Sequence, residues 1–141
     1  MKVKRQRITV EELLSRYAAG ERDFTCIAID DSRKGLFRGV DLSGINLEDS
    51  ALSVDFSGAI LREANFRYTV WGRCHWQEGD FSGSDFTGIN NGVECVFACC
   101  NFSNTNWERA NLWQSTFEDC DLSGANFDNA SLAEVDLLYK S

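Results

Sequence analysis

Residues 97–137 read FACCNFSNTNWERANLWQSTFEDCDLSGANFDNASLAEVDL, in which a bulky apolar side chain returns at every fifth position. These bulky residues are Phe97, Phe102, Trp107, Leu112, Phe117, Leu122, Phe127, Leu132 and Leu137. A small or short side chain stands two positions before each of them. A period of five fits neither an α-helix, with about 3.6 residues per turn, nor the two-residue alternation of a strand. It fits very short strands separated by corners, with the small and the bulky side chain both pointing inward.

The pattern continues toward the N-terminus with small changes of register. Four corners would close a coil of about twenty residues, so equivalent positions should recur at that distance. The first side then stacks Phe37, Phe56, Trp76, Phe97, Phe117 and Leu137, at spacings of 19, 20, 21, 20 and 20 residues. The second side stacks Leu42, Leu61, Phe81, Phe102 and Leu122, the third Phe24, Leu47, Phe66, Phe86, Trp107 and Phe127, and the fourth Ile29, Leu52, Trp71, Leu112 and Leu132. A short insertion follows Ile29, and a one-residue insertion near Asn91 and Gly92 predicts a bulged corner.

The residues around the bulky positions agree with a coil of tight corners. The chain contains no proline, which would remove a backbone N–H needed for bonds between coils. Glycine follows the bulky residue by two positions at Gly44, Gly58, Gly83, Gly88 and Gly124, where a turn with positive φ favours it. Aspartate or asparagine directly precedes the bulky residue at Asp41, Asn46, Asp55, Asn65, Asp80, Asp85, Asn101, Asn106, Asn111, Asp121, Asn126 and Asp136. Such side chains hydrogen-bond nearby backbone at turns, so we interpret these acids and amides as structural.

Four segments carry a family resemblance. Val40–Gly44 (VDLSG), Ala64–Phe66, Ala110–Leu112 and Ala125–Phe127 resemble the A(D/N)LXX motif of the pentapeptide-repeat family. The resemblance extends over residues 24–137, although Phe and Trp often replace the usual Leu, and Cys, Ser, Thr or Ile the usual Ala. It implies an all-β fold, a right-handed quadrilateral parallel β-helix of about five to six coils. It also implies a non-enzymatic protein from a family that is commonest in cyanobacteria.

The two ends of the β-helix are expected to differ. Thr9–Glu12 forms a predicted capping box, Leu13, Leu14 and Tyr17 share an apolar face, and Gly20 marks a stop. We therefore expect an N-terminal basic arm and capping helix over residues 1–21, the β-helix over 22–138 and a tail over 139–141, in one domain. The C-terminal coil has no comparable helix, and an open strand edge favours association. A homodimer through that coil is a hypothesis.

Composition narrows the classes of function. The chain has 141 residues, 43% apolar and 26% charged, and no run of about 18 apolar residues, which predicts one soluble domain without a membrane span. A net charge of −8 disfavours direct binding of nucleic acid, because such binding depends on Lys and Arg that displace counterions. We expect a cytoplasmic protein.

The cysteines and the histidine offer little chemistry. Four cysteines occupy inward small positions, with Cys74 under Cys95 and Cys100 under Cys120, whereas Cys26 and Cys99 face outward. Coils about 4.8 Å apart are within disulfide range, so bridged pairs and reduced thiols as small core fillers both remain open. The single histidine, His75, points away from Cys74, which excludes a shared metal site, and no second histidine supports a catalytic triad. We predict no enzyme and no cofactor.

Outward aromatic side chains supply the candidate binding residues. Trp113 follows Leu112 on the fourth side, near Val70, Arg73, Val93 and Glu94 of lower coils, and Tyr68 also stands outside the inward columns. An exposed Trp beside Arg is typical of an interface anchor, although a Trp lying flat over a neighbouring loop is an open alternative. The candidate protein-binding residues are Trp113, Tyr68, Arg73 and Val70.

Two functions follow from these observations. The first is a rigid scaffold that binds another protein along one flat face. The second is a DNA-mimicking inhibitor of DNA gyrase, because some acidic members of the resembled family inhibit that topoisomerase. Arg62, Arg67, Arg73 and Arg109 interrupt the acidic surface, and the C-terminal helical dimerisation segment of those members is not seen here.

Overall fold

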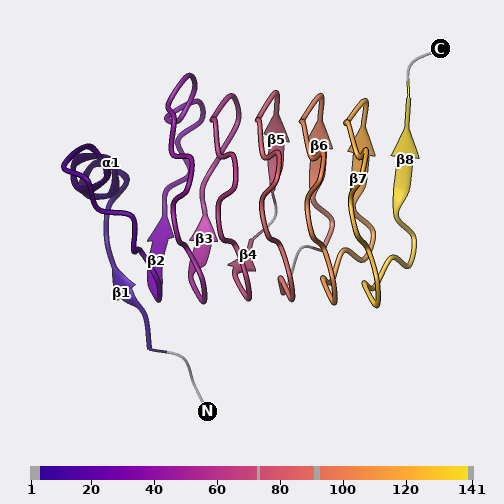
Figure 1. Ribbon diagram of the computed structural model, residues 1–141, viewed down its shortest axis with the longest axis horizontal. Helices are drawn as coiled ribbons and strands as arrows, with labels where there is room; N and C mark the ends of the chain where they lie inside the picture. Colours follow the sequence, from indigo (N-terminus) through magenta and orange to yellow (C-terminus); the bar gives the residue numbers. More distant parts are fainter. Residues whose placement is uncertain (1–3, 73, 91–92, 140–141) are drawn as a thin grey trace.

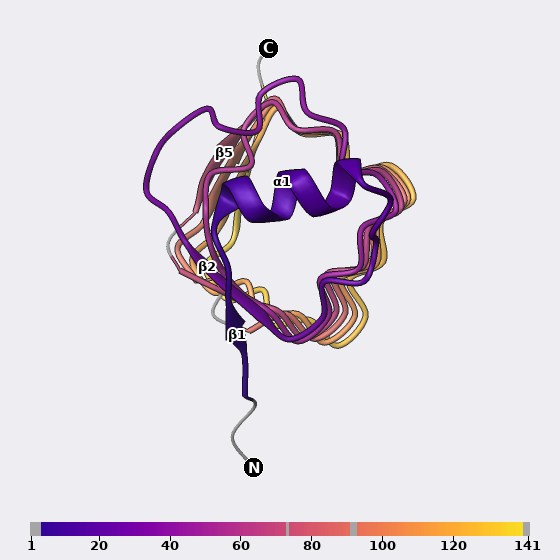
Figure 2. The same cartoon turned by 90° about the vertical axis from the view of Figure 1, so that its left-hand side faces the viewer.

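The computed structural model describes residues 4–72, 74–90 and 93–139. They form a parallel β-solenoid of about six turns, whose coils stack along one axis (Figure 1). Viewed along that axis, the coils superpose as one ring, with helix α1 lying across its N-terminal opening (Figure 2). The fold predicted from the five-residue period is confirmed. The predicted bulge at Asn91 and Gly92 lies outside the described residues.

Regular strands occupy two of the four sides. The elements are β1 (Gln6–Arg7), α1 (Val10–Ala18), β2 (Ile27–Asp30), β3 (Ala51–Ser53), β4 (Val70–Trp71), β5 (His75–Gln77), β6 (Val96–Ala98), β7 (Thr116–Glu118) and β8 (Asp136–Leu138). They form two parallel sheets of four strands, in the order β1-β2-β3-β4 on the fourth side and β5-β6-β7-β8 on the first. The other two sides are joined by single bridges between coils, such as Asp80 with Asn101 and Asn65 with Asp85.

The strand registers confirm the predicted columns. Ile29, Leu52 and Trp71 align on β2, β3 and β4. Trp76, Phe97, Phe117 and Leu137 align on β5 to β8. Backbone hydrogen bonds run from coil to coil, as from the Phe81 N–H to the Asn101 carbonyl at 2.8 Å. These bonds explain why proline is excluded from the repeats.

Aromatic rings stack inside the solenoid. On the third side the centroids of Phe66, Phe86, Trp107 and Phe127 are 4.9, 4.2 and 5.9 Å apart, with interplanar angles of 10°, 11° and 11°. Each buried ring contributes roughly 1.5–3 kcal/mol as an upper estimate, and the coils on either side supply its burial. The core therefore depends on contact between neighbouring coils.

The predicted helix covers the N-terminal end. Thr9 caps α1, since its hydroxyl accepts a hydrogen bond from the Glu12 N–H at 3.0 Å. Val10 and Leu13 are buried beneath the helix, and Gly20 ends it with a φ of +104°. Strand β1 was not predicted, because its polar residues carry no pentapeptide pattern; it pairs in parallel with β2. The insertion after β2 bulges beyond the ring (Figure 2). Helix α1 is too short to cross a membrane, and no longer apolar helix occurs in the described chain.

Candidate protein-binding surface

Most acids and amides that precede a bulky residue hold a turn. In each case the side-chain oxygen accepts the backbone N–H two residues ahead, as Asp80 does from Ser82 at 3.1 Å. The same bond is made by Asp41, Asn46, Asp55, Asn65, Asp85, Asn101, Asn106, Asn111, Asp121 and Asn126. The structural interpretation of these residues is confirmed, because their side chains hold the turns.

Tyr68 lies at a corner between the third and fourth sides. Its φ is +57°, and Gly88 of the following coil has a φ of +65°. A Cβ at Gly88 would lie 2.5 Å from Cε1 of Tyr68, so the glycine leaves the room that the tyrosine ring occupies. The ring therefore packs against the next corner while 42% of the residue stays exposed.

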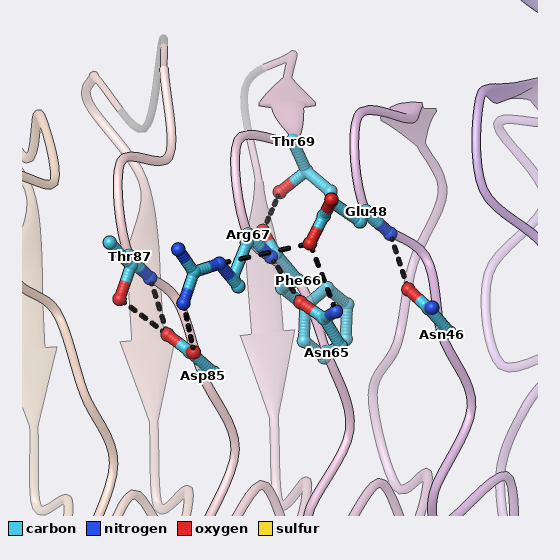
Figure 3. Close-up of polar contacts among 8 residues, drawn as sticks. All are labelled: Asn46, Glu48, Asn65, Phe66, Arg67, Thr69, Asp85 and Thr87. Atoms are coloured by element: carbon cyan, nitrogen blue, oxygen red, sulfur yellow. Dashed lines mark hydrogen bonds and ion pairs between the residues drawn. The ribbon is translucent and has the colours of Figure 1, made fainter.

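Arg67 joins three neighbouring coils beside Tyr68 (Figure 3). Its guanidinium lies 3.7 Å from a Glu48 oxygen on the coil before and 3.3 Å from an Asp85 oxygen on the coil after. It also lies 5.4 Å from the Tyr68 ring centroid, within cation–π range. Interaction with Tyr68 and then the charge of Asp85 raise the pKa of Arg67, so it stays cationic. Asn65 donates to the same Glu48 oxygen at 3.2 Å, which fixes that carboxylate as well.

Trp113 is the second large aromatic residue exposed on a side of the solenoid, also at 42%. Its backbone is tied on both sides: its N–H donates to Asn111 at 3.3 Å and its carbonyl accepts from Glu94 at 2.9 Å. Its indole ring makes no ring–ring contact with another described aromatic residue. The side chain is thus partly exposed on a backbone that is fixed by hydrogen bonds.

The structure brings only part of the predicted set together. Val70 follows Tyr68 closely and is half-buried in β4, where it pairs with Ala51. Asn90 bridges to Val70, and the Asn111 N–H donates to the Ile89 carbonyl, which places Trp113 two coils beyond Tyr68, about 10 Å along the axis. Tyr68 and Trp113 therefore share the fourth side without touching. Arg73 lies outside the described residues.

The sulfur and imidazole groups lie as predicted. Cys74, Cys95, Cys100 and Cys120 are buried, Cys99 is exposed, Cys26 is half-buried, and all six thiols are free. His75 is exposed, on the opposite face of the chain from Cys74. Within residues 4–72, 74–90 and 93–139, no three His, Cys, Asp or Glu side chains gather as a metal site would require.

A polar cleft of about 600 Å³ opens where the insertion after β2 passes the first side. Asp55 lies on its wall and fixes the inserted loop by accepting the Gly35 N–H at 3.2 Å. Lys34, Arg38 and His75 also line the cleft. This cleft was not predicted from the sequence, because it arises where the insertion meets two later coils.

A family model for pentapeptide repeats matches residues 36–67 and 95–137, in eight copies. This chain belongs to the pentapeptide-repeat family. Most of the Asp and Asn side chains that make the corner hydrogen bonds lie in the matched segments, whereas Asp80 and Asp85 lie between them. The resemblance predicted from the A(D/N)LXX segments is therefore confirmed.

Individual pentapeptide-repeat proteins resemble parts of this one. The pentapeptide repeat protein MfpA of Mycobacterium tuberculosis is 36% identical over 63 residues, which are 45% of this chain and 34% of MfpA. The match thus spans about a third of the length of that curated relative. Among solved structures, Rfr23 from the cyanobacterium Cyanothece is 16% identical, with a TM-score of 0.37 over 93% of this chain and all of Rfr23. QnrB1, a plasmid-mediated fluoroquinolone resistance protein, is 18% identical, with a TM-score of 0.34 over 94% of this chain and 73% of QnrB1.

Arg67 was predicted to lie on the surface of this pentapeptide-repeat protein, but its ion pairs with the neighbouring coils were not. Its partners Glu48 and Asp85 lie 19 and 18 residues away, one coil to either side. Once the twenty-residue coil is known, outward residues one coil apart can be paired. Opposite charges at such positions would have identified the ion pairs of Arg67 with Glu48 and Asp85.

Proposed function

We propose that this pentapeptide-repeat protein is a rigid, non-enzymatic scaffold that binds another protein along its fourth side, with Trp113 and Tyr68 as anchors. The observation that carries the proposal is the 42% exposure of each of these residues, which lie in the turns at the two ends of the fourth side. Most polar groups around them are engaged in turns or ion pairs. The two aromatic side chains are large, partly exposed groups that a partner could bury.

The energetics of association favour such anchors. Buried Trp and Tyr residues commonly cost about 2 kcal/mol or more of binding free energy when they are truncated. Ordering of flexible segments opposes binding by about 0.5–1.5 kcal/mol per immobilised side chain. Here Trp113 projects from a backbone that is hydrogen-bonded to Asn111 and Glu94, so little backbone ordering remains.

Affinity capture tests the surface. Immobilised wild-type protein and the Trp113→Ala variant would be exposed to the same cell extract, with Tyr139→Ala as the matched control. Tyr139 is aromatic and 63% exposed but lies beyond β8, away from the fourth side. We expect a partner that binds the wild type and Tyr139→Ala and is lost from Trp113→Ala. Identical partners for all three proteins would contradict the proposal.

Tyr68→Ala defines how far the surface extends. Loss of the same partner would place Tyr68 and Trp113 under one interface that spans two coils. Circular dichroism must show an unchanged fold, because the Tyr68 ring also packs against the Gly88 corner. Retention of the partner would limit the interface to the coils around Trp113.

An uneven charge distribution favours a second candidate, inhibition of DNA gyrase by DNA mimicry. Residues 93–139 contain eight acidic side chains and one basic side chain, Arg109. On the preceding coils, Arg62 and Arg67 are paired with Asp80 and Asp85, so the negative charge of these two carboxylates is offset. A supercoiling assay tests this function directly. Supercoiling unaffected by excess protein would exclude it, whereas inhibition that is lost on Glu118→Lys would support it.

A homodimer through the C-terminal coil completes the proposal. Strand β8 is the last strand of its sheet, and Leu137, Leu138 and Tyr139 are exposed around it. Apolar side chains on an open strand edge favour pairing with a second copy. Light scattering at micromolar concentration should then give twice the mass of one chain for the wild type, and the mass of one chain for Leu137→Asp. The mass of one chain for the wild type would contradict the dimer.

A further inference from the structure

Two buried thiols meet between neighbouring coils on the first side. Cys74 and Cys95 directly precede β5 and β6, which pair in parallel with His75 opposite Val96. Their sulfurs approach the same acceptor, since Sγ of Cys74 lies 3.1 Å and Sγ of Cys95 4.0 Å from the Gly72 carbonyl oxygen. The two side chains also hydrogen-bond to each other. They form a dithiol that spans two coils.

One member of this pair faces the cleft. Cys74 lines the cleft of about 600 Å³ and is 6% exposed, whereas Cys95 behind it is 0% exposed. Lys34 and Arg38 line the same cleft, as do Asp30, Asp31 and Asp55, so both signs of charge surround the opening to Cys74. Asp55 on the opposite wall is already engaged by Ser57 and Gly35. A small solute can therefore reach Cys74 from solvent.

The hydrogen bond prepares the pair for loss of one proton. Donation from Cys74 lowers the pKa of Cys95, and the same bond together with burial raises the pKa of Cys74. One proton is thus shared between two sulfurs, and a single negative charge is stabilised by the neighbour that retains it. The charge therefore rests on Cys95, and Cys74 keeps its proton until it reacts.

We propose that Cys74 and Cys95 are a reversible oxidation site, at which hydrogen peroxide entering the cleft converts the dithiol to a disulfide between neighbouring coils. Cys74 passes its proton to the Cys95 sulfur as it attacks one peroxide oxygen, the O–O bond breaks, and the departing hydroxide takes up a proton from solvent to become water. Cys74 is then a sulfenic acid. Cys95 attacks its sulfur, the S–S bond forms, the S–O bond breaks, and the hydroxide leaves with the Cys95 proton as a second water. Two thiols are oxidised by two electrons, and one peroxide is reduced to two waters.

The coil geometry is compatible with the product. Neighbouring parallel strands lie about 4.8 Å apart, and disulfides join Cα atoms that are roughly 4.4–6.8 Å apart. The bond would fasten the coil that carries β5 to the coil that carries β6. Reduction by an ordinary thiol would restore the dithiol, because Cys74 stays accessible from the cleft.

A second thiol pair supplies an internal control. Cys100 and Cys120 are also buried, hydrogen-bond to each other and stack on neighbouring coils of the second side. Sγ of Cys120 lies 3.2 Å from the Phe97 carbonyl oxygen, yet neither of these two cysteines lines the cleft. The two pairs share their stacking and differ in access to the cleft.

The experiment uses the full chain with Cys26→Ser and Cys99→Ser, which removes the two thiols outside the core. After brief treatment with hydrogen peroxide, the protein is unfolded, alkylated without reduction and mapped by peptide mass spectrometry. We expect a Cys74–Cys95 link that forms at least about tenfold faster than any Cys100–Cys120 link, and dithiothreitol should reverse it. Equal rates for the two pairs, or four alkylated thiols throughout, would overturn the proposal.

Two single substitutions in the same background separate the roles of the two sulfurs. Cys95→Ser should leave a sulfenic acid on Cys74 that dimedone traps, because the resolving thiol is gone. Cys74→Ser should leave Cys95 unoxidised over the same period; oxidation of Cys95 at the rate of the parent would refute the cleft route. If either variant fails to fold, Cys100→Ser with Cys120→Ser in the parent background isolates the first pair. The assay measures oxidation and not partner binding, so its failure is distinguishable from a failure of the proposed protein-binding function.

Discussion

The two ends of one aromatic column differ in what covers them. Phe24 and Phe127 are the first and last residues of the third side, at equivalent positions in the repeat. Phe24 is 1% exposed, because α1 closes that end and the Arg16 guanidinium lies 4.9 Å from its ring centroid. Phe127 is only half-buried, with Trp107 and Phe117 as its ring neighbours at 5.9 and 6.2 Å. The fourth side repeats the contrast, since Ile29 is buried and Leu132 is exposed.

This difference separates two things that the repeat encodes. The pentapeptide directs a side chain toward the axis at both ends, because the corner hydrogen bonds are local. Burial, and the stability that comes with it, depends on having a coil or a cap on each side. Substitutions at equivalent positions should therefore change stability by unequal amounts, and the amount should follow the burial of the side chain rather than its residue type.

The largest effect is expected at the centre of the second side. Phe102 is fully buried, with the rings of Phe81 and Trp107 at centroid distances of 5.1 and 5.2 Å. Phe102→Asp would place an unpaired charge in this column, so we expect no soluble folded protein. Leu132→Asp, at an exposed bulky position, should remain soluble and melt cooperatively by circular dichroism. A folded Phe102→Asp protein would contradict the continuous core.

Truncation at the two ends of the third side should give a graded difference. Phe24→Ala is expected to cost about 3–5 kcal/mol of unfolding free energy, the range for buried aromatic residues. Phe127→Ala leaves a much smaller cavity, because one side of its ring already faces outward, and should cost less than half as much. Urea unfolding of both variants measures the two values. Equal costs would mean that the C-terminal coil is covered in solution, as the proposed dimer would cover it.

The inward columns were predictable from the sequence because their signal is repeated in every coil. A bulky residue at every fifth position and an Asp or Asn before it fixed the assignment of Phe66, Phe86 and Trp107 to one side, although they lie 20 and 21 residues apart. The helix signals at Thr9 and Gly20 are local and were equally clear. Because the pattern is local and repeats at a fixed period, it determines which side chains point inward without information about long-range packing.

The surface was less predictable, because it depends on which outward residues become neighbours. Trp113 and Tyr68 were identified as exposed, but the packing of Tyr68 over Gly88 requires knowledge of the coil above it. The ion pairs of Arg67 with Glu48 and Asp85, and the cleft beside Cys74, also depend on which coils lie next to each other. Strand β1 has no periodic signal at all and is held by its pairing with β2.

A smaller effect is expected from removing the cap of the covering helix. Thr9→Ala deletes the hydroxyl that accepts the Glu12 N–H and should cost about 1 kcal/mol. Ser15→Ala in the same helix is the matched control, because Ser15 is exposed and alanine is a good helix former. Hydrogen exchange should quicken in α1 and around Phe24 while the coils near Phe127 are unchanged. Faster exchange at both ends would show that the cap stabilises the whole solenoid.

The smallest effect is expected in the pH dependence of stability. It should differ between two turn carboxylates, Asp55 and Asp121, that accept different numbers of hydrogen bonds. Partial burial alone would raise the pKa of Asp55, but hydrogen bonds from Ser57 and from the Gly35 N–H outweigh it and hold that pKa below its usual value. The pKa of Asp121, near the open end, is lowered by Ser123 alone. A carboxyl group whose pKa is depressed by folding stabilises the protein above its unfolded pKa of about 3.9, and this contribution is lost as the pH falls through the folded pKa.

Urea midpoints measured from pH 7 to pH 2 should therefore fall less steeply for Asp55→Asn than for the wild type. Asp121→Asn should change the profile less, because asparagine already makes the same turn bond at Asn101 and Asn126. At pH 7, Asp55→Asn should itself be slightly destabilising, since the amide nitrogen that replaces one oxygen cannot accept the Gly35 N–H. Parallel profiles for all three proteins would show that the second donor at Asp55 adds nothing, and that the insertion beside the cleft is held by other contacts.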